Sequence, residues 1–397
     1  MSKKNKNPEL TPPVEETSGV AVKEPKKKKK KKGSGLLGRI VRRFFLLLFT
    51  VVILALVALV MVMNVVFNGP SPAARNILTM SLTEASATKW VPGLFLGDEL
   101  VAEIRQGNQV ELTEEITNTD LVVINRDNAA SSDVDEFANE PDGIIIEHYA
   151  GDTFNAHIML IDDPSRVFMG TSSPQFSTSI PGKRITEAIE EAGESVVAAV
   201  NAGAFYDDGS ANSIVGSVPA GLVYARGEMV WDAYHGLVPA TTGGGFVGFN
   251  DDDVLVVAKS MTNAEAEAQN IRDGCEFGPV LIVNGEVNME AYTGSGWNPR
   301  TAIGQRADGV VIFICVDGRQ AGSVGATYGD VIDMMLEYGA VNACNLDGGS
   351  STVMMYRDTH GKLGEPGEVK MINNYSLLQS KPRRMPNYWM VSAVNEE

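Results

Sequence analysis

The C-terminal part of the chain alternates short apolar runs with polar turns. From Gly143 onward, each apolar run ends at a cluster of Gly, Asp or Asn, which is typical of buried strands separated by tight turns. The runs predict strands at Ile158–Ile161, Val196–Val200, Val280–Val283, Val310–Val316 and Val341–Leu346. Asn284-Gly285 is a hairpin signal, so the third of these strands is expected to turn back toward Val287.

One predicted helix links the last two of these strands. It covers Tyr328–Tyr338, with Thr327 as its N-terminal cap and a glycine as its stop signal. A strand, a helix and a second strand form a parallel crossover, which brings the carboxyl ends of both strands to one edge of the sheet. Asn201 is expected to join that edge if its own strand runs the same way. The expected fold is α/β (α+β), with a mixed, partly parallel sheet flanked by helices.

A continuous apolar segment precedes this region. Phe44–Met63 is twenty residues long with one polar residue, so at roughly 1.5 Å per residue it spans a hydrocarbon core of about 30 Å. Cations gather before it, in Lys26–Lys32 and three arginines, and the next cation after it is Arg75. The positive-inside rule predicts a single-pass cell-membrane protein with a cytoplasmic N-terminus and an extracellular domain. A cleaved signal peptide is the competing interpretation, with Ser71–Ala74 as a weak cleavage site.

These features divide the chain into four parts. Residues 1–43 are expected to be a disordered basic tail, 44–66 a transmembrane helix, 67–142 a membrane-proximal stalk or spacer, and 143–397 the catalytic domain. The tail holds 14 Lys and Arg against 4 Asp and Glu, whereas the rest of the chain holds 19 against 46. Such an acidic remainder excludes a general nucleic-acid binder, because phosphate neutralisation needs clustered cations. The basic stretch beside the span favours contact with anionic lipid.

Four segments place polar residues beside glycines, which let a ligand approach the backbone closely. They are V-N-A-G-A-F-Y-D-D-G (200–209), N-P-R-T-A-I-G (298–304), V-D-G-R (316–319) and N-L-D-G-G-S-S (345–351). Arg300 and Arg319 are scarce cations in an acidic domain, and each could form a fork for a phosphate. Asp317 and Asp347 are candidate acids, bases or metal ligands. The same residues also fit ordinary turns, or a structural pair between Arg300 and Asp317.

Metal binding is left open by the sequence. Calcium at the two aspartates is the one cofactor considered, because acidic loops outside a cell commonly bind it. The cysteines Cys275, Cys315 and Cys344 allow one disulfide at most and lack the paired spacing of a zinc site. Cys315 lies in an apolar run and is expected to be a small core residue.

The same segments resemble those of the phosphodiester glycosidase family. N-A-G-A-F-Y, N-P-R-T-A-I-G, V-D-G-R and G-A-T-Y, followed by Y-G-A-V-N-A-C-N-L-D-G-G-S-S-T, occur in family order between about His148 and Val394. Cys344 stands where small residues are more usual, and Ala204 where many members carry an aromatic residue. The chain resembles uncovering-enzyme-like N-acetylglucosamine-1-phosphodiester alpha-N-acetylglucosaminidase domains, in the membrane-anchored bacterial form associated with exopolysaccharide biosynthesis.

The resemblance implies an enzyme that hydrolyses the sugar–phosphate bond of glycosyl phosphodiesters in cell-envelope or exopolysaccharide glycans. For this reaction we expect Asp347 to act as nucleophile or as base for water, Asp317 to orient Asp347 or the sugar, and Asn201 to hydrogen-bond the sugar or its phosphate. Arg300 and Arg319 would hold the phosphate. The other implied substrate-binding residues are Thr301, Gly203, Asp207, Gly348, Gly349 and Ser350.

Two other functions fit the same architecture. One is a transferase. An envelope phosphotransferase that attaches polymers to the cell wall would need several arginines to grip a pyrophosphate lipid, and the domain has few, whereas a glycosyl-phosphate transferase would run the glycosidase chemistry in reverse. A non-enzymatic glycan-binding or scaffold subunit of polysaccharide export would bind glycan without turnover. Release of free sugar distinguishes the hydrolase from both.

Overall fold

The computed structural model describes residues 36–85, 87–108, 115–124, 136–206, 216–232, 245–375 and 381–394. The chain divides into two compact units, Met1–Val60 and Met61–Glu397. The candidate residue Asp207 and most of the predicted basic tail lie outside the described residues.

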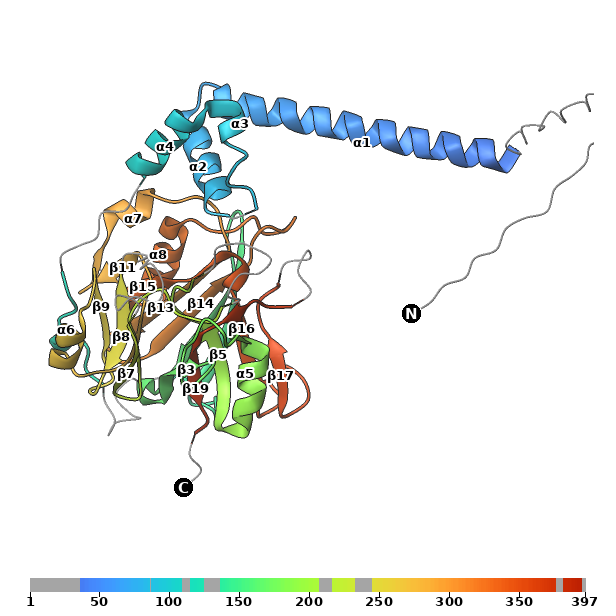
Figure 1. Cartoon of the computed structure of the whole chain (residues 1–397). Coiled ribbons are helices and arrows are strands. Elements are labelled where there is room, and N and C mark those ends of the chain that lie inside the picture. The colour runs from blue at the N-terminus through green and yellow to red at the C-terminus, as the bar shows by residue number, and fades with distance from the viewer. Residues whose placement is uncertain are drawn as a thin grey trace, which may run out of the picture. The chain divides into compact units, whose positions relative to one another are not determined.

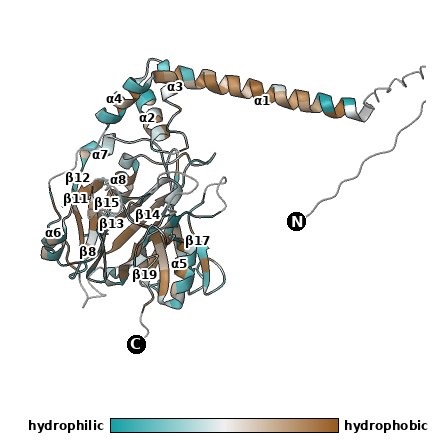
Figure 2. Cartoon of the chain, viewed as in Figure 1, coloured by the Kyte–Doolittle hydropathy of each residue, from teal (hydrophilic) through white to brown (hydrophobic). Residues whose placement is uncertain are grey.

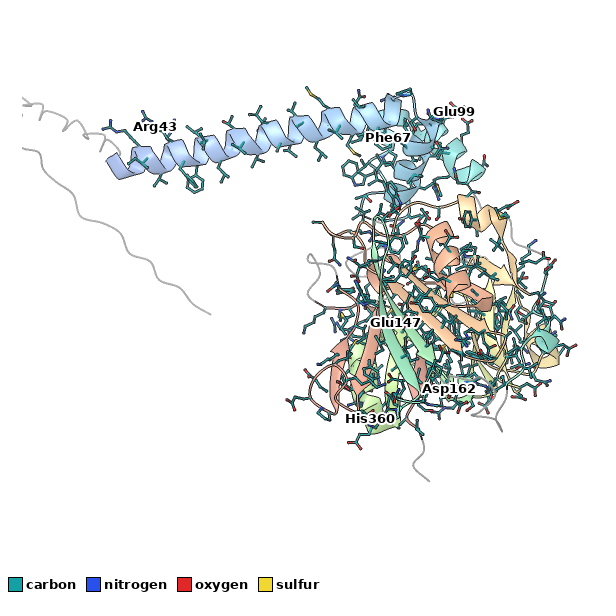
Figure 3. The ribbon with its side chains drawn as sticks, turned by 180° about the vertical axis from the view of Figure 1, so that it is seen from behind. Arg43, Phe67, Glu99, Glu147, Asp162 and His360 are labelled. Carbon is teal, nitrogen blue, oxygen red and sulfur yellow. The ribbon has the colours of Figure 1, made fainter. Side chains whose placement is uncertain are left out.

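Helix α1 contains the apolar segment. It spans Leu36–Asn68, and its stretch from Gly38 to Asn68 is long and apolar enough to cross a membrane. The predicted span at 44–66 lies inside it, and Figure 2 shows apolar residues along most of its length. Phe67 near its end is buried and stacks on Phe95 with 5.0 Å between ring centroids (Figure 3). The helices that follow are α2 (Pro72–Thr83), α3 (Gly93–Leu96) and α4 (Asp98–Gly107).

Three larger sheets make up most of the second unit (Figure 1). The seven-stranded sheet has the order β1 (Ile144–Ala150), β2 (Asn155–Ile161), β14 (Val311–Val316), β13 (Arg300–Arg306), β15 (Ala340–Leu346), β11 (Val280–Val283), β12 (Glu286–Val287). The second sheet has the order β17 (Glu368–Met371), β16 (Met354–Asp358), β5 (Val196–Asn201), β19 (Asn387–Ser392), β3 (Val167–Thr171). The third has the order β7 (Glu228–Trp231), β6 (Val223–Ala225), β10 (Ile271–Glu276), β8 (Phe246–Asn250), β9 (Leu255–Ala258). Strands β4 (Lys183–Arg184) and β18 (Arg384–Met385) form a separate pair, and short 3-10 turns lie at Thr119–Leu121, Pro164–Arg166, Gly193–Ser195 and Gly349–Ser351.

One hydrophobic core lies between the three sheets. Phe313, Trp389 and Phe249, one from each sheet, belong to it and are fully buried. Smaller cores lie on the outer faces, where helices cover the sheets. The seven-stranded sheet is covered by α7 (Met289–Thr293) and α8 (Tyr328–Glu337), the second sheet by α5 (Ile185–Ala192) and the third by α6 (Asn263–Ala268). The central strands β5, β13 and β14 are buried along nearly their whole length, and the polar side chains at and beyond their ends meet near the sheet edge.

The local predictions from the sequence are confirmed. Helix α8 starts after Thr327, whose hydroxyl accepts from the backbone of Asp330 at 3.1 Å in a reciprocal capping box. Strands β11 and β12 form the expected hairpin, with Asn284 and Gly285 at φ of 55° and 80°. The α+β class is also confirmed.

The parallel part of the expected sheet differs from the observed pairing. Strands β14 and β15 run in the same direction, as a crossover requires, but β13 lies between them and pairs antiparallel with both. A short turn between β13 and β14 makes these two a hairpin, so β13 takes the place beside β14. Every strand pairing in the described ranges is antiparallel, and the expected parallel contact is absent from them. The carboxyl ends of β14 and β15 nevertheless reach the same edge.

Candidate active site

A row of side chains crosses the seven-stranded sheet near this edge. His157, Cys315, Thr301 and Leu346 are direct cross-strand partners on β2, β14, β13 and β15. Side chains that lie opposite one another on neighbouring strands point to the same face, and Cys315 and Leu346 belong to the core between the sheets. The row therefore faces the second sheet, where β5 ends at Asn201.

Asn201 joins three segments of the site. Its amide nitrogen donates to the carbonyl oxygen of Asp347, and its amide oxygen accepts from the Thr301 hydroxyl at 2.8 Å and from the backbone N–H of Val353 at 3.1 Å. Asn201 and Thr301 are both fully buried. The structure therefore brings these two predicted residues to Asp347, where they support its backbone.

Replacing Asn201 with alanine is expected to destabilise the domain. The change leaves the Thr301 hydroxyl, the Val353 N–H and the Asp347 carbonyl without their buried partner, which costs about 2–4 kcal/mol of unfolding free energy. Denaturant unfolding of the detergent-solubilised full chain measures this loss, with Glu99→Ala on α4 as a surface control. A loss below about 1 kcal/mol would contradict the assigned role.

Asp347 lies directly after β15 and is half-buried. Its backbone N–H donates to the Ala202 carbonyl at 3.0 Å, which fixes the turn against the end of β5. Burial raises the pKa of Asp347 to about 6, although the Gly348 N–H donates to the carboxylate and opposes the rise. A carboxyl group with this pKa changes protonation state near neutral pH, as acids, bases and nucleophiles in active sites commonly do.

The glycines of the candidate set allow close backbone contacts. A Cβ atom on Gly348 would lie 2.7 Å from the Pro299 carbonyl oxygen, and Gly349 has a φ of 63°. The Gly349 N–H donates to that same carbonyl at 2.8 Å, so this N–H already has a partner within the protein. The Gly203 N–H likewise donates to the Asn387 amide oxygen at 3.1 Å.

Arg319 lies against the Asp347 turn. A Cβ atom on Gly349 would be 3.4 Å from one terminal nitrogen of its guanidinium and 3.6 Å from the other. One of these nitrogens donates to the amide oxygen of Asn298 at 2.9 Å. Partial burial and then the nearby Arg300 cation lower the pKa of Arg319, while Glu84 raises it. The residue remains accessible to solvent and can meet an anion.

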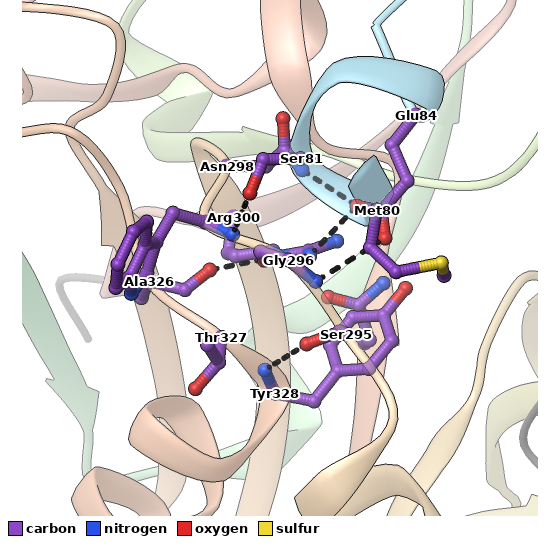
Figure 4. A network of polar contacts seen from close by, with 12 residues as sticks. Met80, Ser81, Glu84, Ser295, Gly296, Asn298, Arg300, Ala326, Thr327 and Tyr328 are labelled. Atoms are coloured by element: carbon purple, nitrogen blue, oxygen red, sulfur yellow. Dashed lines mark hydrogen bonds and ion pairs between the residues drawn. The ribbon is translucent and has the colours of Figure 1, made fainter. Parts of the chain in front are cut away.

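Arg300 is engaged by the protein itself (Figure 4). Its guanidinium donates to the Glu84 carboxylate at 2.9 Å and to the carbonyls of Gly296 and Ala326 at 2.8 and 3.2 Å. It also lies 4.1 Å from the centroid of the Tyr328 ring and is 5% exposed. The structural partner of Arg300 is therefore Glu84, and not Asp317 as the alternative interpretation of the sequence proposed.

Asp317 fixes a neighbouring loop. Its carboxylate accepts from the backbone and side-chain nitrogens of Asn374 at 2.8 and 2.7 Å, and lies 3.4 Å from the His157 ring nitrogen. The next residue in that loop, Tyr375, donates its hydroxyl to the Ser350 carbonyl at 2.6 Å. Asp317 thus reaches the Asp347 turn through Asn374 and Tyr375.

Sequence reasoning missed a third arginine at the site. A terminal nitrogen of Arg383 lies 3.5 Å from the Ser350 hydroxyl oxygen, and its guanidinium lies 4.8 Å from the Phe205 ring centroid. Burial lowers the pKa of Arg383. The scarcity of cations after residue 43 was the available signal, because Arg383 and Arg384 are two of only 19.

The structure adds no support for a metal centre. Within the described residues, no group of three or more His, Cys, Asp or Glu side chains could hold a metal ion. All three cysteines are buried free thiols, and burial raises the pKa of each. Cys315 is the core residue that its apolar surroundings predicted.

A half-buried acid whose turn lies close to two arginines, Arg319 at Gly349 and Arg383 at Ser350, defines a site suited to an anionic substrate. A family model described as phosphodiester glycosidase matches residues 194–392, half of the chain. The chain belongs to the phosphodiester glycosidase family.

Individual relatives are distant. An SPbeta prophage-derived uncharacterized protein, YomE of Bacillus subtilis strain 168, is 28% identical over 201 residues, which are 48% of this chain and 27% of that protein. The catalytic domain of a zebrafish N-acetylglucosamine-1-phosphodiester alpha-N-acetylglucosaminidase, auto-inhibited by its pro-peptide, is 19% identical with a TM-score of 0.47, covering 64% of this chain and 84% of that one. A hypothetical protein from Synechocystis is 17% identical with a TM-score of 0.41, covering 64% and 62%.

Proposed function

We propose that this chain is a membrane-anchored hydrolase that cleaves the bond between the anomeric carbon and the phosphate oxygen of glycosyl phosphodiesters. The observation that carries the proposal is the half-buried Asp347, whose turn lies close to the guanidinium groups of Arg319 and Arg383. Family membership supports the substrate class. The products are a free sugar and a phosphomonoester. The apolar helix and the charge asymmetry around it support an extracellular domain that acts on cell-envelope glycans.

The leaving group explains why arginines can serve here. Glycosidases that expel an alkoxide need a protonated carboxyl group, whereas a phosphomonoester leaves with far less protonation. Arg319 and Arg383 would bind the phosphate through charge-assisted hydrogen bonds and stabilise its charge as the bond breaks. Arg300 takes a supporting role in this scheme, because its donors are bound to Glu84 and to backbone carbonyls.

Asp347 would supply the electron pair for the reaction. Its carboxylate either attacks the anomeric carbon directly or takes a proton from the attacking water, and both roles need the ionised form. Asn201 holds its backbone from one side. Asp317 fixes the loop that contacts Ser350 from the other side, and we place it as a positioning residue.

The proposed role of Asp347 fixes the direction of the pH dependence. The protonated form dominates below its pKa of about 6, so kcat/KM is expected to fall about tenfold per pH unit below that value and to level off above it. Initial rates of sugar release from an N-acetylglucosamine-1-phospho ester between about pH 4.5 and 8 measure this profile in the detergent-solubilised full chain. Activity that rises as the pH falls through 6 would assign Asp347 the role of a general acid instead.

A further inference from the structure

Glu84 is the C-terminal cap residue of α2, and its side chain contacts the loop that leads into β13 (Figure 4). One oxygen of its carboxylate accepts from the Asn298 amide nitrogen at 2.6 Å and from the Arg300 guanidinium at 2.9 Å. The other oxygen accepts from the Gly296 N–H at 3.5 Å. In the same contact, the backbone N–H of Trp297 donates to the Ser81 hydroxyl at 2.7 Å. The end of α2 therefore binds this loop through both side-chain and backbone groups.

The contact with Glu84 decides how the Asn298 amide is turned. Its other end, the amide oxygen, accepts from Arg319 at 2.9 Å. A carboxylate only accepts hydrogen bonds and a guanidinium only donates them, so one orientation of the amide satisfies both neighbours. The backbone of Asn298 is fixed as well, by reciprocal hydrogen bonds with Ala326 at 3.1 and 3.0 Å. Glu84, Asn298 and Arg319 thus form a continuous chain of directed hydrogen bonds that ends beside the Asp347 turn.

The charges of these residues also link Glu84 to Arg319. Burial and then the nearby Arg300 cation lower the pKa of Arg319, and the Glu84 carboxylate opposes that effect. The Glu84 side chain is 26% exposed and that of Arg300 is 6% exposed, so the ion pair between them is only weakly screened by water. Without this carboxylate, the two guanidinium groups would repel one another across Asn298.

We propose that Glu84 is a positioning residue for substrate binding, which holds Arg319 toward the substrate phosphate through Asn298. The inference rests on the proposed function, in which Arg319 binds that phosphate. By this proposal, the end of α2 contributes a residue to substrate binding, although α2 precedes the glycine-rich segments by more than a hundred residues.

Steady-state kinetics of the full chain in detergent test the proposal with a glycosyl phosphodiester. Glu84→Gln removes the charge and one acceptor, and is expected to raise KM about tenfold while kcat stays within about threefold of wild type. Asn298→Ala keeps the pair between Glu84 and Arg300 and removes only the link to Arg319, so it should raise KM by a similar factor. Glu99→Gln, at an exposed position on α4, is the matched control and should leave KM unchanged (Figure 3 labels Glu99).

A double-mutant cycle separates positioning from a general structural role. In an Arg319→Ala background, Glu84→Gln should change KM by less than about twofold, because its effect acts through the missing guanidinium. The same KM factor in both backgrounds would overturn the proposal. An unchanged KM in Glu84→Gln would also overturn it. A lower KM would overturn it too, since it would mean that the carboxylate competes with the substrate phosphate. If Glu84→Gln fails to fold, an unchanged KM in Asn298→Ala overturns the proposal by itself.

A binding measurement keeps this inference distinct from the proposed function. If the wild-type chain releases no sugar, the proposed function fails, and calorimetric titration with inorganic phosphate decides the positioning role. Weaker phosphate binding in both Arg319→Ala and Glu84→Gln would then support it. Weaker binding in Arg319→Ala alone, or no phosphate binding to the wild type, would overturn it.

Discussion

Asp347→Asn is expected to abolish turnover while leaving a folded and more stable protein. The amide keeps the size of the side chain but can neither attack the anomeric carbon nor accept a proton from water. We expect kcat to fall by at least about a thousandfold, as when a catalytic nucleophile or base is removed. Sugar release by the purified variant, followed over hours, measures the residual rate.

The stability change in this variant has a definite sign. The pKa of Asp347 is about 6 in the folded protein and near 3.8 in an unfolded chain, so the folded state favours the protonated form. The group therefore costs no stability at low pH and costs about 1–3 kcal/mol once it is ionised, above pH 6. Asp347→Asn should remove that cost at pH 8 and change little at pH 4.

Thermal unfolding at the two pH values checks this pattern. Asp152→Asn is the matched control, because Asp152 is exposed and the same charge is removed without relief of burial. Near-normal turnover in Asp347→Asn would contradict the mechanism. Lower stability of the variant at pH 8 would contradict the assigned environment of the carboxyl group.

Arg319→Ala is expected to remove most of the phosphate recognition. The guanidinium supplies a charge and paired donors to the leaving phosphate, so kcat/KM should fall by about a hundredfold to a thousandfold. Arg319→Lys should recover part of the loss, since lysine keeps the charge without the planar fork. The backbone of residue 319 has a φ of 56°, which Arg, Ala and Lys adopt at similar cost, so fold stability should change little.

A substrate comparison isolates the role of the phosphate. The loss in Arg319→Ala should be large for a glycosyl phosphodiester and small for an aryl glycoside with a neutral, easily expelled leaving group. Equal losses on both substrates would mean that Arg319 acts on the sugar or on the fold, and not on the phosphate.

The features that the sequence predicted well depend on near neighbours in the chain. The capping box at Thr327 and Asp330 and the hairpin at Asn284-Gly285 are set by residues within a few positions of one another. The common edge of β14 and β15 also followed from local signals, because a strand, a helix and a strand in sequence fix the direction of both strands. Asp317 and Asp347 could therefore be placed at one edge, even though the strand between them was not foreseen.

The features that sequence reasoning missed depend on contacts between distant segments. The ion pair between Glu84 and Arg300 joins residues 216 positions apart, and nothing near either residue specifies the other. Asn374 is likewise far from Asp317 in the sequence. It donates two hydrogen bonds to the Asp317 carboxylate, which supports the positioning role that we propose for Asp317. Arg383 lies directly before β18, in a segment without a glycine-rich pattern, so only its charge marked it. The composition of the chain can mark such residues as candidates, but only the folded structure shows which residues they contact.

In the proposed reaction, this domain breaks the bond between the anomeric carbon of the sugar and the phosphate oxygen. The most direct measurement is turnover of an N-acetylglucosamine-1-phospho ester by the full chain in ¹⁸O-labelled water, with mass spectrometry of both products. Attack at the anomeric carbon predicts one labelled oxygen in the free sugar and none in the phosphomonoester. Label in the phosphomonoester would identify cleavage at phosphorus. Failure of the folded protein to release either product would contradict the proposed hydrolase activity.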